Sequence, residues 1–205
     1  MSQRIDLNGF EARFADDSDP WQTFVARDEA VKRDRIVRAL GQASHARILE
    51  LACGNGSNSV RLARRCRALD ACDGTVAAAA LTRRALAGQP HARVYRCVLP
   101  GRLPRPRYEA IVIAELLYYL DRRAMATLAR DVVGAMRPGG RLILAHHHTD
   151  FHDTAQTSRR IHPRFIAATG RCWTRRRHYR NGRWSVDAFQ LDERPHGHAF
   201  SPAEQ

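Results

Sequence analysis

A glycine-rich segment, Glu50-Leu-Ala-Cys-Gly-Asn-Gly-Ser-Asn58, carries the residues with the clearest chemical potential. Glycines at such a turn let the backbone approach a ligand closely, and a helix that starts there presents free N–H groups. Asp73 follows at the tip of a second apolar run, where a carboxylate can accept hydrogen bonds from ribose hydroxyls. This pattern predicts a nucleoside-binding site. The alternative is that Gly54 and Gly56 only shape a tight turn while Asp73 caps the next helix.

Acid–base side chains follow two later apolar runs. Glu115 and Tyr118 come after the first, and three consecutive histidines end the second. A histidine at this position could orient or deprotonate a substrate near neutral pH. Because side chains alternate along a strand, His146 and His148 share one face and His147 the other. The catalytic candidates are His146, Glu115 and Tyr118. The alternatives are a loop histidine without a specific ligand, favoured for His147, and a packing role for Tyr118.

Neither metal-binding nor disulfide chemistry is predicted. Asp150, His152 and Asp153 have suitable ligand types, but the His-His-His-x-x-x-His spacing matches no standard zinc pattern, so we expect no metal. The cysteines, at positions 53, 66, 72, 97 and 172, form no CxxC pair, which is typical of reduced thiols in the cytoplasm. No signal peptide and no apolar run long enough to span a membrane are found. The oligomeric state is left open.

The formal net charge of +13 raises the question of nucleic acid. Lys32 is the only lysine, so 33 of the 34 basic residues are arginine, whereas phosphate-binding surfaces commonly use both types. No arginine-rich run alternates with aromatic residues, as a single-strand binding surface would. The charge therefore indicates an arginine-rich surface and does not favour nucleic acid as a partner. The length of 205 residues fits one α/β domain.

Apolar periodicity and turn residues locate the elements that must position these side chains. Asp121 is the expected N-cap of the clearest helix, and Asn181-Gly182 predicts a hairpin turn. Helices are expected over residues 26–40, 60–66, 77–86 and 122–136. Strands are expected over residues 46–51, 69–72, 94–99, 108–114 and 141–146, followed by a hairpin of 172–179 and 183–191. Residues 1–25 are interpreted as a loop or short arm, 149–162 as loop or short helix, and 192–205 as a mobile tail.

These elements predict an α/β fold: a doubly wound, seven-stranded, mostly parallel sheet with a C-terminal antiparallel hairpin. The glycine pattern differs from Gly-x-Gly-x-x-Gly, because Ala52, Gly54 and Gly56 alternate with single residues. With Glu50 at the strand end, it resembles the first motif of the class I S-adenosylmethionine-dependent methyltransferases, E/D-x-G-x-G-x-G. The segment 136–144 resembles that family's turn before strand five. The resemblance covers roughly residues 45–191.

In that family, the acidic residue of the motif orients the loop or contacts the methionine amine. The glycine turn lies beside the methionine and ribose, and the acid ending strand two binds both ribose hydroxyls. The resemblance gives these roles to Glu50, to Gly54 and Gly56, and to Asp73.

A narrower resemblance is carried by Asp19-Pro-Trp21, Glu29-Ala-Val-Lys32 and Ala114-Glu-Leu-Leu-Tyr-Tyr-Leu120, which look like the nodulation protein S group. Members of that group resemble N-methyltransferases of amino-sugar or glycoconjugate precursors, with an N-terminal arm folded over the cofactor. The resemblance implies S-adenosylmethionine, bound by Trp21, Lys32, Glu50, Ala52, Gly54, Gly56, Asn58, Asp73, Gly74, Val98, Leu99 and Glu115. It divides the chain into an arm or helical lid (1–45), a methyltransferase domain (46–191) and a flexible tail (192–205).

Two residues depart from the family pattern. Ala52 replaces the first glycine, which a methyl group tolerates if φ is negative. Val98 replaces the usual aspartate for the adenine amino group, a task that backbone groups near Val98 and Leu99 could take over.

The predicted activity is therefore S-adenosylmethionine-dependent methyl transfer, most simply to an amine on a small-molecule or amino-sugar-like acceptor. One alternative is an RNA methyltransferase, suggested by the net charge and by the arginines of residues 159–183. A separate RNA-binding domain and an Asn-Pro-Pro-Tyr type motif are missing from the sequence, which argues against it. The other alternative is a non-catalytic binding or partner domain with a decayed cofactor site, which Ala52 and Val98 would support.

Overall fold

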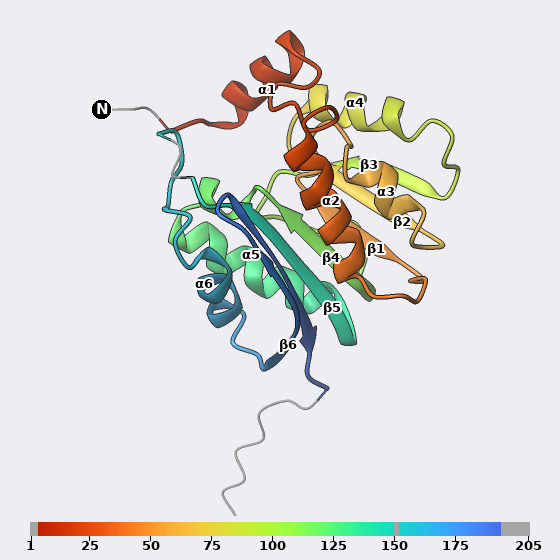
Figure 1. The fold of residues 1–205 in the computed structure, drawn as a ribbon, viewed down its shortest axis with the longest axis vertical. Coiled ribbons are helices and arrows are strands. Elements are labelled where there is room, and N and C mark those ends of the chain that lie inside the picture. The colour runs from red at the N-terminus through yellow and green to blue at the C-terminus, as the bar shows by residue number, and fades with distance from the viewer. Residues whose placement is uncertain (1–3, 150–151, 194–205) are drawn as a thin grey trace, which may run out of the picture.

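Seven strands form one sheet in the computed structural model, which describes residues 4–149 and 152–193 (Figure 1). The strands are β1 (Ile48–Leu51), β2 (Leu69–Asp73), β3 (Ala92–Arg96), β4 (Tyr108–Ala114), β5 (Met136–His147), β6 (Trp173–Arg180) and β7 (Trp184–Leu191). Their order is β3-β2-β1-β4-β5-β7-β6. The strands β1 to β5 are parallel, whereas β7 is antiparallel to both β5 and β6. The predicted fold class is confirmed.

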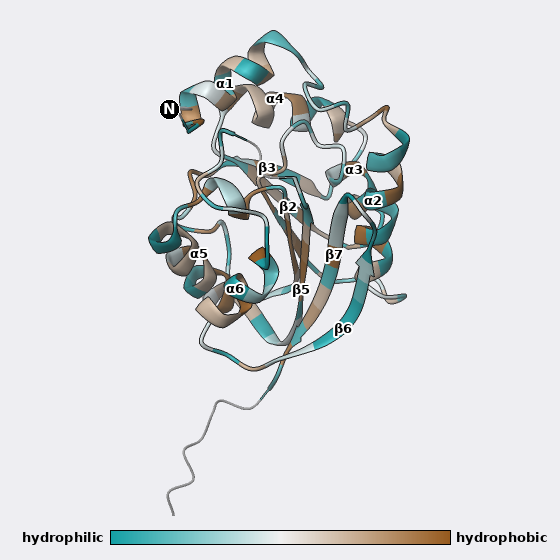
Figure 2. Cartoon of the chain, turned by 60° about the vertical axis from the view of Figure 1, so that its left-hand side comes forward, coloured by the Kyte–Doolittle hydropathy of each residue, from teal (hydrophilic) through white to brown (hydrophobic). Residues whose placement is uncertain are grey.

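Helices cover both faces of this sheet. They are α1 (Leu7–Asp16), α2 (Arg27–Ala39), α3 (Ser59–Ala63), α4 (Val76–Ala85), the short 3₁₀ helix η1 (Leu117–Tyr119), α5 (Arg122–Ala135) and α6 (Ile161–Ala168). Ile36 of α2 and Leu62 of α3 belong to one core cluster, and Leu128 of α5 and Phe165 of α6 to the other. The central strands are accordingly hydrophobic, while the edge strand β6 is mostly hydrophilic (Figure 2). No helix in the described ranges combines the length and apolar character needed to cross a bilayer.

The clearest predicted helix, α5, forms as expected. The Asp121 side chain caps it by accepting the Ala124 N–H at 2.8 Å. Met125, Leu128 and Val132 are buried on its inner face. Its end agrees with the prediction, but β5 begins at once at Met136, so that the turn residues 137–140 belong to the strand.

Two local predictions are wrong. Residues 1–25 contain α1, which Asp6 caps by accepting the Gly9 N–H and which buries Phe14. The third strand is β3 at residues 92–96 and ends before Val98. The helix α6 begins at Ile161, near the end of the segment interpreted as loop or short helix, and continues to Ala168. Charged residues interrupt the apolar pattern of residues 1–25 and 92–99, so contacts elsewhere in the fold decide the local structure. From residue 194 onward, the predicted tail lies outside the described residues.

Candidate functional site

The predicted site residues meet at the carboxyl ends of the central strands, where the sheet reverses its winding between β1 and β4. Ala52 directly follows β1 with φ 55°, and Glu115 directly follows β4 with φ 54°. The condition under which a methyl group at Ala52 was expected to be tolerated, a negative φ, is therefore not met. A non-glycine residue in this left-handed region costs about 1–3 kcal/mol and is common at functional sites. Two strained residues thus flank the crevice in which open α/β sheets bind ligands.

The glycine-rich loop is packed tightly between two helices. Gly54 and Gly56 have φ values of 56° and 87°. A Cβ atom on Gly56 would lie 3.1 Å from Thr82 Cα in α4, and Thr82 Oγ1 donates to the Gly54 carbonyl at 2.8 Å. A Cβ atom on Gly54 would lie 3.4 Å from the ring of Phe14 in α1. The glycines therefore permit close packing by α4 and α1, in addition to any ligand contact.

Glu50 is a buried carboxyl group on β1. It is 1% exposed and accepts a hydrogen bond from Ser59 Oγ. Burial raises its pKa to about 8; the hydrogen bonds from Ser59 and Asn58 oppose this rise, and the neighbouring Asp73 adds to it. Glu50 is therefore mostly neutral at pH 7. A cationic group beside it would favour ionisation.

Asp73, the last residue of β2, links the glycine-rich loop to the start of α4. Its Oδ2 accepts the Gly54 N–H at 3.0 Å, and its Oδ1 accepts the Thr75 N–H at 3.0 Å and Thr75 Oγ1 at 2.9 Å. Burial raises its pKa against the effect of these hydrogen bonds. Thr75 itself supplies the N-cap of α4, and Glu11 of α1 accepts the first two N–H groups of that helix at 2.6 and 2.9 Å. Asp73 is thus not the capping residue.

An ionic cluster connects α2 to the ends of β4 and β5. It consists of Lys32, Glu29, Glu115, His147 and Tyr118, and is called the Lys32 cluster below. The Lys32 ammonium group, 3% exposed, donates to Glu29 Oε1 at 2.8 Å and to Glu115 Oε1 at 2.7 Å. The His147 ring bridges the same two oxygens, at 3.2 Å from Glu29 and 3.0 Å from Glu115. The Tyr118 hydroxyl donates to Glu115 Oε2.

The charges of the Lys32 cluster stabilise one another. Burial opposes the ionisation of Glu115, but Lys32 and His147 outweigh it and hold the pKa of that carboxyl well below its usual range. Burial likewise lowers the pKa of His147, but the hydrogen bonds to Glu115 and Glu29 dominate and raise it to about 9. At pH 7 Glu115 is therefore ionised and His147 is cationic. Glu115 retains 29% side-chain exposure, so an ionised carboxylate reaches the surface at the crevice.

The N-terminal segment is fastened to the glycine-rich loop. Asp19 Oδ1 accepts hydrogen bonds from Asn55 Nδ2 at 2.8 Å and from Thr23 Oγ1 at 2.7 Å. Trp21 packs against Phe14 with ring centroids 5.3 Å apart. In this arrangement Trp21 covers the glycine-rich loop through Phe14, and Figure 1 shows α1 above the strand ends beside α4.

The remaining predicted cofactor residues lie on the β2–β3 side. A Cβ atom on Gly74 would lie 2.7 Å from Leu7 Cδ1 of α1. Val98 is 54% exposed and Leu99 is partly buried, both beyond the end of β3. Asn58 precedes α3 and hydrogen-bonds Glu50. The structure thus brings Glu50, Asn58 and Asp73 together beneath α1, with Val98 at the rim.

Of the three catalytic candidates, His146 is placed differently from expectation. Its side chain is enclosed, with 1% exposure, and Nε2 accepts the N–H groups of Leu116 and Leu117 at 3.3 and 3.1 Å. Nδ1 lies 3.0 Å from His162. Burial and His162 hold its pKa well below the usual value. The histidine that joins Glu115 is instead His147, on the opposite face of β5, for which a loop role without a specific ligand was favoured.

Sequence reasoning also missed partners from the N-terminal third of the chain. Glu29 lies three residues before Lys32, and this spacing places both side chains on one helix face. Asp19 and Asn55 belong to two separate sequence motifs and pair only in the folded protein. An aspartate and an asparagine that are distant in sequence give no signal of such a pair.

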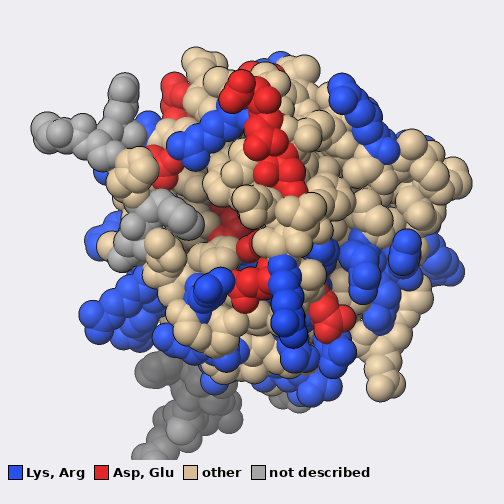
Figure 3. Space-filling view, turned by 45° about the horizontal axis from the view of Figure 1, so that its top comes forward, with Lys and Arg blue, Asp and Glu red and all other residues tan. Residues whose placement is uncertain are grey.

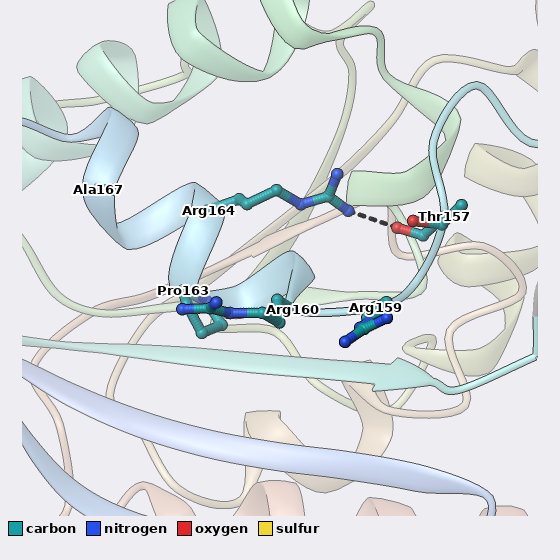
Figure 4. Close-up of a pocket in the computed structure, with 6 residues that line it drawn as sticks. All are labelled: Thr157, Arg159, Arg160, Pro163, Arg164 and Ala167. Carbon is teal, nitrogen blue, oxygen red and sulfur yellow. Dashed lines mark hydrogen bonds between the residues drawn. The ribbon is translucent and has the colours of Figure 1, made fainter.

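Among the described residues, no group of three or more histidine, cysteine, aspartate or glutamate side chains could hold a metal ion. A pocket of about 480 Å³ lies beside α6, lined by Thr157, Arg159, Arg160, Pro163, Arg164 and Ala167 (Figure 4). None of the predicted site residues lines it, and the Arg164 side chain turns toward the Thr157 carbonyl, to which it donates. The face that carries α1 shows carboxylates gathered through its middle, with arginines around them (Figure 3).

Comparison with known proteins identifies the family of this chain. The family model for nodulation protein S matches residues 9–152. The chain belongs to the nodulation protein S family. Nodulation protein S of Sinorhizobium fredii is 28% identical over 127 residues, which are 61% of this chain and 59% of that protein. The match thus spans less than two thirds of the curated relative.

Two solved structures share the fold. The N-methyltransferase NodS of Bradyrhizobium japonicum, in complex with S-adenosyl-L-homocysteine, superposes with a TM-score of 0.79 at 19% identity, covering 90% of this chain and 97% of that one. A Pseudomonas syringae protein assigned as a methyltransferase is 28% identical, with a TM-score of 0.71 over 80% of this chain and 99% of its own. The chain therefore shares its fold with these two structures.

Proposed function

We propose that this protein is an S-adenosylmethionine-dependent methyltransferase that methylates an amine on a small, amino-sugar-like acceptor. The observation that carries the proposal is the position of Glu115, an ionised and partly exposed carboxylate on a strained backbone at the switch point of the sheet. The family membership and the S-adenosyl-L-homocysteine complex of the Bradyrhizobium protein support the choice of cofactor.

The residues at the ends of β1 and β2 fit such a cofactor. Glu50 is a buried carboxyl group that a cationic amine would ionise, which suits a methionine portion. Asp73 has two carboxylate oxygens that retain acceptor capacity for ribose hydroxyls beyond their protein hydrogen bonds. Gly54 and Gly56 present backbone without side chains. The bound cofactor would supply a sulfonium methyl group for in-line displacement.

The chain's own task is then to position a neutral amine and to exclude water. Glu115 accepts a hydrogen bond from the acceptor amine and attracts its ammonium form, whose excess proton leaves to solvent before transfer. Lys32 and His147 keep Glu115 ionised. Tyr118 fixes the orientation of Glu115 through its hydroxyl. Within residues 1–45, α1 and the loop that carries Asp19 act as the lid, while α2 stays fixed through Lys32 to a catalytic domain of residues 46–191.

The experiment has a binding arm and a turnover arm. Isothermal titration with S-adenosylhomocysteine tests the cofactor, and a mass-spectrometric assay with amino sugars tests the acceptor, with the matching N-acetyl sugars as controls that lack a free amine. Glu115→Gln should keep cofactor affinity within about threefold and reduce turnover by about 10²-fold or more. Absence of binding heat with millimolar S-adenosylhomocysteine would contradict the methyltransferase assignment. Methylation of the N-acetyl sugars would contradict an amine as the methyl acceptor.

A further inference from the structure

A chain of buried hydrogen bonds runs from the loop after β4 across β5 and α6 to β7. His146 Nε2 accepts the N–H groups of Leu116 and Leu117 at 3.3 and 3.1 Å, and His146 Nδ1 lies 3.0 Å from His162 Nε2. His162 Nδ1 lies 2.7 Å from Asp187 Oδ2. His146, His162 and Asp187 are 1%, 4% and 5% exposed. These three side chains are called the histidine relay below.

The two ends of the relay determine where each ring carries its proton. His146 Nε2 receives two backbone N–H groups, so it is the unprotonated nitrogen, and Nδ1 carries the proton. That proton can be donated only to His162 Nε2, so the proton of His162 is on Nδ1 and is donated to Asp187. With one proton on each ring, every donor meets an acceptor. Reversing either ring would place N–H groups against one another, at a cost of about 1–3 kcal/mol for each unsatisfied buried group.

The relay ends on the segment that carries the proposed acceptor-binding residues. Glu115 precedes Leu116 and holds a strained φ of 54°, which persists only when surrounding contacts fix it. Tyr118 follows Leu117, and its ring packs edge-on against the His146 ring with centroids 5.4 Å apart. His146 therefore contacts this segment through two hydrogen bonds and one ring face.

We propose that Asp187 and His162 are positioning residues that fix the Nδ1–H tautomer of His146 and thereby hold the loop that carries Glu115 and Tyr118. The consequence for methyl transfer rests on the proposed function. The tautomer and the anchoring of the loop are properties of the folded chain and do not depend on it.

The test uses the intact protein and three variants. Long-range ¹H–¹⁵N NMR of the histidine rings reports the tautomer of His146, and amide hydrogen exchange reports the anchoring of Leu116 and Leu117. His162→Phe retains an aromatic ring but offers His146 no acceptor. His162→Gln restores one acceptor and one donor. The matched control is His178→Phe, because His178 Nδ1 binds the other oxygen of Asp187, at 2.7 Å, without touching His146.

The wild-type protein should show His146 protonated on Nδ1 and bare on Nε2. In His162→Phe, exchange at Leu116 and Leu117 should accelerate about tenfold, the factor that corresponds to the loss of one hydrogen bond worth ~1.4 kcal/mol. The Gln variant should return exchange to within about threefold of wild type, and His178→Phe should leave it unchanged. A wild-type His146 protonated on Nε2, or unaltered exchange in His162→Phe, would overturn the proposal. If no amine acceptor were methylated, the proposed function would be refuted, whereas the tautomer of His146 and the exchange rates of Leu116 and Leu117 would still test this proposal.

Discussion

Replacing Glu50 with glutamine should stabilise the fold and weaken cofactor binding. Glu50 is 1% exposed, and burial raises its pKa from 4.5 to about 8. The folded state therefore keeps a proton that the unfolded state releases above pH 4.5. The free energy of unfolding of the wild-type protein therefore decreases as the pH rises from 4.5 toward 8. At ~1.4 kcal/mol for each pH unit between 4.5 and 7, the carboxyl group costs the wild-type fold about 3 kcal/mol at pH 7.

Glutamine resembles the neutral acid in size and cannot ionise. Glu50→Gln should therefore raise the free energy of unfolding by about 3 kcal/mol at pH 7, equivalent to a melting temperature higher by about 6–12 °C in a chain of this size. At pH 4 the two proteins should be equally stable. Urea unfolding at pH 4, 5.5 and 7 measures the difference. Replacement of the exposed Glu193 by glutamine is the control and should change stability by less than about 0.5 kcal/mol at every pH.

Two results would refute this reasoning at different steps. A variant equally destabilised at pH 4 and pH 7 would show that folding leaves the pKa of Glu50 unchanged, and the argument from burial would fail. A variant stabilised as expected but with wild-type affinity for S-adenosylhomocysteine would show that Glu50 does not bind the ligand amine. The combination of higher stability and lost affinity is typical of a group retained for function.

Three further changes test the strained and ionic parts of the site. Ala52→Gly should raise the free energy of unfolding by about 0.5–1 kcal/mol, because relief of the left-handed alanine outweighs the added entropy of the unfolded chain. Ala80→Gly in the α4 interior should lower it by about 1 kcal/mol in the same urea assay. The pKa of His147 is raised to about 9. Protonated His147 therefore stabilises the folded protein fully below pH 6.5, and this stabilisation disappears between pH 6.5 and 9. The decrease in the free energy of unfolding over this range should be smaller by about 3 kcal/mol in His147→Gln than in the wild type, measured by urea unfolding. Lys32→Met should lower the free energy of unfolding by less than the ~3–5 kcal/mol of a fully unpaired buried charge, because His147 still contacts Glu29 and Glu115. Adding Glu115→Gln should recover part of that cost in a double-mutant cycle, whereas strict additivity would contradict the pairing.

The parallel core of the fold could be predicted from the sequence because its signals are local. The run 108–114 is apolar except for Glu109, and β4 has those same limits. Asp121 supplies a cap whose partner is only three residues away. By contrast, α1 follows no clear apolar period in the sequence, and it contacts residues that are distant along the chain. Glu11 caps α4, 65 residues further along. No window of the sequence contains both ends of that contact.

The candidate site likewise contains residues that the sequence could locate and residues that it could not. The glycines and Asp73 could be found because a backbone conformation or a strand tip demands them at fixed spacing. The choice between His146 and His147 could not, because adjacent residues on a strand differ only in the face they occupy. That face is decided by α2 on one side and α6 on the other, which supply Glu29 and His162 respectively.

The free-energy cost of displacing each helix from the carboxyl edge of the sheet decides which part of residues 1–45 can act as a lid. Displacing α2 would remove Lys32 from Glu115, which would keep His147 as its charged partner, and would expose the fully buried Ile36, at about 1.5–3 kcal/mol for that side chain alone. Displacing α1 would expose Phe14, worth about 2–3 kcal/mol, break the partly exposed Arg13–Asp153 ion pair, worth at most about 1 kcal/mol, and remove Glu11 from the first N–H groups of α4. Because α2 buries Lys32, Ile36 and Ala39 whereas α1 buries Phe14, opening of the site costs less through α1 and the loop that carries Asp19 than through α2. In energetic terms α2 belongs with the catalytic domain, and the lid ends before it.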